Sequence, residues 1–117
     1  MSAAKAKGTA AETAVATWLR DNGFPYAERR ALAGIADKGD LTGIPGLCVE
    51  VKAHARLAIP EWLRELDAEV ANSAAAVGLL VVKPKGIGVT RVGDWWAVQR
   101  LSSAAGLLRE AGWSGDA

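Results

Sequence analysis

The feature that most constrains the fold of this chain is the apolar run at residues 77–83, VGLLVVK. Its length fits one β-strand, and because polar and apolar residues do not alternate along it, we expect both of its faces to be covered. The preceding residues 60–76 have helical spacing, with Pro60 in the first turn. Their apolar face carries Trp62, Leu66, Val70 and Ala74. A helix that leads into a strand covered on both faces predicts a layered α/β fold.

The first half of the chain is predicted to contain one helix and three strands. Residues 9–22 have helical periodicity, with Thr9 as the expected N-cap and Glu12 at the spacing of a capping box. Residues 24–30 are expected to form a strand. Residues 40–44 and 47–52 are expected to form a hairpin around the Pro45-Gly46 turn.

The last third is predicted to contain a second hairpin and a third helix. The hairpin would pair residues 89–92 with residues 95–98, and the helix would span residues 100–111. Trp18 and Trp62 are expected in the core, whereas Trp95-Trp96 places one indole on each face of its strand.

Composition restricts the classes of function. The 117 residues fit one domain, 1–117, with residues 1–8 and 113–117 expected to be flexible tails. The formal net charge of +1 argues against a general polycation, although basic residues can still surround an acidic site. A single cysteine and a single histidine exclude a cysteine-based zinc site and a histidine-rich metal site. Any metal would therefore be held by oxygen ligands, which favours Mg²⁺, with Mn²⁺ as a substitute.

No membrane or export segment is expected. The N-terminal residues MSAAKAKG lack the apolar run of a secretory signal, and the apolar stretch at 74–82 is too short to span a membrane. We therefore expect a cytoplasmic protein.

Residues 39–54, GDLTGIPGLCVEVKAH, carry the main candidate chemistry. Side chains alternate along a strand, so Glu50 and Lys52 share one face, and the hairpin would bring Asp40 beside them. Two carboxylates that converge beside a lysine suit a magnesium site. The alternating Val-Glu-Val-Lys pattern is equally typical of an ordinary strand with one solvent-exposed face.

The ordered set of motifs resembles the PD-(D/E)XK nuclease superfamily. The order KGTAAETAVATWLRDNGF, ERR and GDLTGIPGLCVEVKAH is most similar to the archaeal-type Holliday junction resolvases, over about residues 7–85. Glu50-Val51-Lys52 matches the family tripeptide in full, whereas Gly39 stands where the family has proline. The resemblance implies a restriction-endonuclease-like mixed sheet flanked by helices, with an α-β-β-β-α-β core.

The resemblance also implies a function and roles for individual residues. The protein would be a magnesium-dependent endonuclease that hydrolyses DNA phosphodiester bonds at four-way junctions and acts as a homodimer. Asp40 and Glu50 would be metal ligands together with the Val51 carbonyl, and Lys52 would position water and stabilise charge on the phosphate. Glu12 would support the metal site from the first helix, although capping alone could explain this residue.

Cations near the acidic residues are the predicted DNA contacts. They are Arg29, Arg30, Lys38, His54, Arg56, Lys83 and Lys85. Solvated surface charge is the alternative for each of them. The alternative functions are another nuclease of the superfamily (restriction-like, nicking or repair), a non-catalytic DNA-binding module, and a small structural α/β protein.

Overall fold

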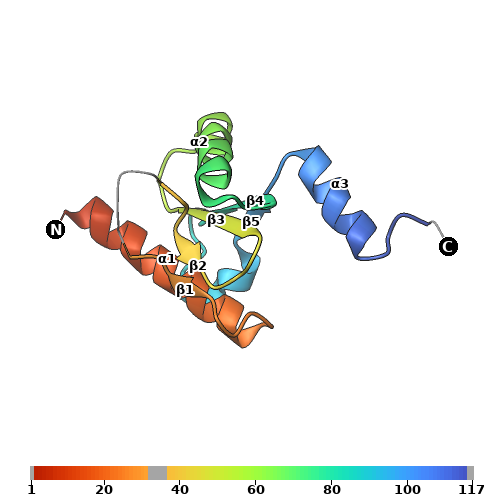
Figure 1. Ribbon diagram of the computed structural model, residues 1–117. Helices are drawn as coiled ribbons and strands as arrows, with labels where there is room; N and C mark the ends of the chain where they lie inside the picture. The colour runs from red at the N-terminus through yellow and green to blue at the C-terminus, as the bar shows by residue number, and fades with distance from the viewer. Residues whose placement is uncertain (1, 32–36, 116–117) are drawn as a thin grey trace.

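The computed structural model describes residues 2–31 and 37–115, and it has helices on both sides of a small sheet (Figure 1). In chain order the elements are α1 (Ala3–Asp21), β1 (Glu28–Arg29), β2 (Leu41–Thr42), β3 (Leu47–Lys52), α2 (Ile59–Ser73), β4 (Val77–Val82), the 3₁₀ helix η1 (Val89–Asp94), β5 (Trp96–Val98) and α3 (Leu101–Glu110).

The main sheet is mixed and has the strand order β3-β4-β5. β3 and β4 are parallel from the pair Leu47–Val77 to the pair Lys52–Val82, and β5 runs antiparallel to β4. Parallel neighbours need a crossover connection, and α2 provides it. These features confirm the predicted α/β class with a mixed sheet.

Side chains of β3 divide the core into two clusters on opposite faces of the sheet. Val49 and Val51 pack with Ala11, Val15 and Ala16 of α1. Cys48 packs on the other face with Trp62 and Leu66 of α2 and with Leu80 and Val82 of β4. Figure 1 shows α1 and α2 on opposite sides of the sheet. Because Glu50 and Lys52 alternate with Val49 and Val51, they share the face of Cys48, toward α2.

The first helix begins earlier than predicted. α1 starts at Ala3, and its N-cap is Ser2, whose Oγ accepts a hydrogen bond from the Lys5 N–H at 3.1 Å. Thr9 therefore lies inside the helix, and the predicted capping box with Glu12 is wrong. Residues 3–8 are helical, so the predicted tail at 1–8 is also wrong for this part, while residues 1, 116 and 117 lie outside the described residues.

The strand predictions hold best for the buried strands. β3 spans the predicted residues 47–52, and β4 ends at Val82, one residue before the predicted end. The strand predicted at 24–30 is reduced to Glu28–Arg29, and β2 pairs with β1 in a separate two-stranded sheet. The predicted hairpin between residues 40–44 and 47–52 is therefore not formed: among the described strands, β2 does not pair with β3 in a sheet.

The predicted hairpin of residues 89–92 and 95–98 is wrong. Residues 89–94 form η1, and only Trp96–Val98 form a strand, β5. The Trp95 indole explains this, because its Nε1–H donates to the carbonyl oxygens of Ile87 at 3.1 Å and Gly88 at 3.2 Å. The buried ring thus anchors a compact loop where the second strand was expected. Trp95 is buried and Trp96 is exposed, as predicted for this pair.

Two helical predictions need smaller corrections. Trp62 is buried as expected, but Trp18 is 39% exposed and does not lie in the core. The second helix ends at Ser73, because Ala74 adopts a left-handed conformation with φ 55° at the C-cap.

The third helix, α3, projects away from the sheet (Figure 1). None of its residues is buried, and Leu101 and Leu108 are among its exposed apolar side chains. Across the described part of the chain, no helix combines the length and apolar character needed to span a membrane.

Candidate functional site

Glu50 lies at the centre of the candidate site. It stands in β3 with only 6% of its surface exposed, so the solvent-exposed strand face that the alternating pattern allowed does not apply to this residue. Its Oε2 atom is buried and receives no hydrogen bond from the described residues. A buried carboxylate oxygen without a donor is costly unless a proton or a cation compensates it.

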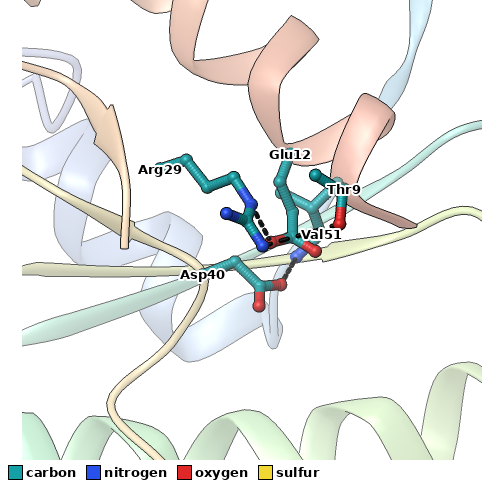
Figure 2. Close-up of polar contacts among 5 residues, drawn as sticks. All are labelled: Thr9, Glu12, Arg29, Asp40 and Val51. Carbon is teal, nitrogen blue, oxygen red and sulfur yellow. Dashed lines mark hydrogen bonds and ion pairs between the residues drawn. The ribbon is translucent and has the colours of Figure 1, made fainter. Parts of the chain in front are cut away.

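Asp40 lies just before β2 and contacts β3 although it is not itself part of a strand. Its backbone N–H donates to the Val49 carbonyl at 2.8 Å, and its Oδ2 accepts a hydrogen bond from the Val51 N–H at 2.7 Å (Figure 2). The carboxylate thus takes the place that a backbone carbonyl of a neighbouring strand would hold. The N–H and C=O of one strand residue point to the same side, so the Val51 carbonyl also faces this edge.

Gly39 allows this approach. It has φ +94°, and a Cβ at this position would lie 2.8 Å from the Cys48 Sγ and 3.0 Å from the Val49 oxygen. Proline, whose φ is fixed near about −65°, cannot adopt this conformation. The glycine that departs from the resembled motif therefore has a structural reason in this chain.

Glu12 extends toward the same edge from α1. Its Oε1 accepts a hydrogen bond from Arg29 Nε at 3.1 Å, and this ion pair connects α1 with β1 (Figure 2). Burial raises the pKa of Glu12, and the nearby Asp40 carboxylate raises it further, while Arg29 opposes both effects. Glu12 therefore lies close enough to Asp40 for the two carboxylates to influence each other.

Lys52 is held as a cation beside Glu50. Its Nζ lies 2.8 Å from Glu65 Oε2 and 3.6 Å from Glu50 Oε1, and it sits 5.9 Å from the centre of the Trp62 ring. Burial lowers the pKa of Lys52, but the hydrogen bond to Glu65 and the charge of Glu50 outweigh this effect and leave it raised.

The acidic residues repel one another. Burial raises the pKa of Glu50 strongly, and Glu69 and Asp40 raise it further. Burial also raises the pKa of Asp40, although its hydrogen bond from Val51 opposes the shift. Such mutual repulsion is typical of carboxylates that share one site.

A hollow of about 350 Å³ joins the predicted site residues. Its lining residues are Ala4, Lys7, Gly8, Glu12, Asp40, Glu50, Val51, Lys52, Ala53, His54 and Ala55. All four predicted catalytic residues and the predicted ligand Val51 thus border one space. Lys7, at the start of α1, adds a cation that sequence reasoning missed.

The predicted DNA contacts are dispersed. His54 lines the hollow and lies 5.3 Å from the Trp62 ring between centroids, and Arg29 is connected to the hollow through Glu12. Arg30 lines a different hollow with Tyr26 and Thr42, and its guanidinium donates to the Leu41 carbonyl at 3.4 Å. The remaining predicted contacts do not appear in the lining of the 350 Å³ hollow as far as the described residues define it: Lys38, Arg56, Lys83 and Lys85.

Three further acidic residues surround Glu50 on the α2 side. They are Asp37, Glu65 and Glu69. One ligand oxygen from each of Asp37, Glu50 and Glu69 lies within 4.8 Å of the others, a grouping that could hold a metal ion. The expected ligand set contained Glu50 but neither of the other two. The spacing of Glu69, three residues after Leu66 and seven after Trp62, places it on the apolar face of α2 and could have indicated it.

Comparison of the chain with protein-family models, with curated proteins and with solved structures gives no match.

Proposed function

We propose that the protein is a metal-dependent DNA endonuclease of the PD-(D/E)XK type, selective for branched DNA as a Holliday junction resolvase is. One observation carries the proposal: Glu12, Asp40, Glu50 and Lys52 come from three separate segments yet border one hollow. An ordinary exposed strand face does not account for this convergence, since Glu50 is buried.

The fold is compatible with a restriction-endonuclease-like core. A first helix covers one sheet face, β3 carries the Glu-Val-Lys tripeptide, and α2 crosses over to the parallel strand β4. β1 and β2 form a separate two-stranded sheet in this chain, so the main sheet of the proposed core contains only β3, β4 and β5 among the described strands.

The residues present fit a hard divalent cation. Asp40 and Glu50 supply carboxylate oxygens, the Val51 carbonyl faces the same edge, and Glu50 Oε2 has no protein donor. When bound, Mg²⁺ would polarise the scissile phosphate and favour attack by water.

Lys52 would act through its charge. Its raised pKa keeps the ammonium protonated, so it suits stabilisation of the negative charge that develops on a phosphate and is unsuited to removing a proton from water. His54 and Lys7 border the same hollow and would contact flanking phosphates.

A cleavage assay tests the proposal directly. The full chain is incubated with a four-way junction, a duplex and a single strand, each with Mg²⁺ and with a chelator. We expect paired symmetric nicks on the junction that require Mg²⁺. Equal cutting of the duplex would favour a nuclease of other specificity, binding without turnover would favour a DNA-binding module, and neither binding nor cutting would refute both.

Junction cleavage at two symmetric positions calls for two active sites, so we propose a homodimer. The exposed apolar residues of α3, together with Trp96 and Trp113, offer surface for such a contact.

A further inference from the structure

The inner carboxyl cluster, defined as Asp37, Glu50 and Glu69, lies on the α2 side of β3. Glu50 is 6% exposed and Glu69 is 3% exposed. The Oε2 atom of each is buried without a hydrogen-bond donor among the described residues. Two acidic side chains more than nine-tenths buried thus each direct an unsatisfied oxygen into the protein at the same place.

The neighbouring cation does not satisfy these oxygens. Lys52 Nζ approaches Glu50 through Oε1, at 3.6 Å, and makes its shorter contact of 2.8 Å with Glu65. No cation among the described residues contacts the Oε2 atom of Glu50 or of Glu69. Buried carboxyl oxygens in proteins are generally offset by a proton, a cationic partner or a metal ion, and no cationic partner contacts these two among the described residues.

The cluster is held in place before any ligand binds. Asp37 Oδ1 accepts a hydrogen bond from the Gly39 N–H at 2.9 Å, and its carbonyl accepts one from Asn72 Nδ2 of α2 at 2.8 Å. Glu69 lies on the same helix, three residues before Asn72. The segment that carries Asp37 is therefore fastened to the helix that carries Glu69.

The cluster is also accessible. A hollow of about 370 Å³ is lined by Asp37, Glu50, Lys52, Glu65, Ala68 and Glu69, and Asp37 is exposed. When all are ionised, four carboxylates face one ammonium there. The negative charge of this hollow attracts a small cation, and its open side lets the cation reach the two buried carboxylate oxygens.

We propose that the inner carboxyl cluster binds a divalent cation of the Mg²⁺ or Mn²⁺ class at a position separate from the one formed with Asp40. The three ligand oxygens lie within 4.8 Å of one another. Cation–oxygen distances of about 2.0 to 2.6 Å place opposite ligands about 4 to 5 Å apart, so the cluster matches one ion. Glu50 is the carboxylate that the two positions share. The inference goes beyond the proposed function, because it makes Glu69 of α2 a ligand and does not require nuclease activity.

Titration with MnCl₂ tests this site on the full chain, with free Mn²⁺ followed by its electron paramagnetic resonance signal. The variants are Glu69→Gln and Asp37→Asn, and Glu61→Gln is the matched control because Glu61 is an exposed acid of the same helix. Far-ultraviolet circular dichroism checks that each variant is folded. Asp37→Asn changes an exposed side chain and so tests the site even where Glu69→Gln disturbs the core.

We expect wild type and Glu61→Gln to bind the same number of Mn²⁺ ions. Asp37→Asn and Glu69→Gln should lose one of these ions or bind it at least about tenfold more weakly, as expected for loss of one charged ligand. Equal Mn²⁺ binding by the control and both folded variants would overturn the proposal, as would no binding by wild type. Mn²⁺ binding that depends on Glu69, together with no cleavage of any DNA, would retain this site and reject the proposed function.

Discussion

At the scale of single residues, Asp40 has two roles that can be separated by experiment. Its carboxylate accepts the Val51 N–H at 2.7 Å and is also a proposed metal ligand. Asp40→Asn retains an oxygen for the hydrogen bond but removes the charge, so we expect at least about a hundredfold loss of Mg²⁺-dependent cleavage with little loss of stability. Asp40→Ala should also lose about 1 to 3 kcal/mol of stability, because the Val51 N–H is left without its acceptor.

Nicking rates on a four-way junction and urea unfolding measure these two effects. Cleavage by Asp40→Asn at the wild-type rate would contradict the ligand role. Equal stability of the alanine and asparagine variants would contradict the role in holding β3.

Glu50 should destabilise the metal-free protein at neutral pH. Burial raises the pKa of Glu50 above its ordinary value of 4.5, so above pH 4.5 the native state binds more protons than the unfolded state. Stability therefore falls as pH rises, until the pH passes the raised native pKa. Glu50→Gln lacks this penalty, and we expect its stability relative to wild type to increase by about 1 to 3 kcal/mol between pH 5 and pH 8.

Denaturant unfolding in the presence of a chelator measures this difference, and Glu61→Gln again serves as an exposed control. Excess Mg²⁺ should reduce or reverse it, because a cation stabilises the wild-type carboxylate selectively. A difference that does not change with pH would contradict the raised pKa of Glu50 in the native state.

Gly39 and Gly46 allow steric contact and backbone strain to be compared. Both have positive φ, but a Cβ at Gly39 would meet Cys48 and Val49, whereas nothing lies within 4 Å of one at Gly46. We expect Gly46→Ala to lose about 1 kcal/mol of stability from backbone strain alone. Gly39→Ala should lose more and should also weaken cleavage, because it displaces Asp40. If urea unfolding shows equal losses of stability for the two variants, the residues around Gly39 accommodate the added Cβ at no cost.

At the scale of elements, predictions succeeded where burial decides the structure. Aliphatic side chains dominate residues 77–83 and occupy alternate positions in residues 47–52, and both ranges formed strands at nearly the predicted positions. The predicted hairpin at 89–98 failed because the Trp95 indole donates to the carbonyls of Ile87 and Gly88 in the preceding loop, a side-chain contact that strand patterns do not reveal.

The candidate site was predictable only in part for the same reason. Alternation along residues 47–52 correctly places Glu50 and Lys52 on one face, and the structure brings Asp40 to that strand through a side-chain hydrogen bond. Asp37 and Glu69 lie far apart in sequence and meet through tertiary contacts, among them the hydrogen bond from Asn72 of α2 to the Asp37 carbonyl. An acid on the apolar face of a helix was the available signal for Glu69, since its neighbours Trp62 and Leu66 are buried.

At the scale of the whole molecule, α3 leaves apolar surface without a partner in the described chain. Leu101, Leu108 and Trp113 are 83%, 53% and 78% exposed. If this surface forms the proposed dimer, Leu101→Glu with Leu108→Glu should give a monomer, because buried charges oppose association. Sedimentation equilibrium measures the mass. A monomeric wild type would refute the homodimer, and a double variant that remains dimeric would place α3 outside its interface.

Cys48 gives the molecule a built-in chemical reporter. The residue is 1% exposed, and its thiol donates to the Lys38 carbonyl at 3.5 Å. Burial raises the pKa of this thiol to about 11. Alkylation therefore requires an opening that exposes the thiol, since the thiolate is the reactive form. The Lys38–Gly39 segment covers Cys48 on one side, and Trp62 and Leu66 of α2 pack against it as well. The labelling rate consequently measures openings around Cys48, and that of the segment between Asp37 and Asp40 is the one that a cation at Asp37 would change.

Divalent cations should slow this labelling in wild type and leave it unchanged in Asp37→Asn, because the inner carboxyl cluster would then fasten the segment through Asp37. Mass spectrometry after timed exposure to iodoacetamide gives the rate, with guanidinium-unfolded protein as the reference for a free thiol. Native labelling as fast as this reference would mean that the segment does not protect Cys48. The alkylation rate of Cys48, a residue with no proposed catalytic role, would thus report whether a bound cation holds the neighbouring acidic residues in place.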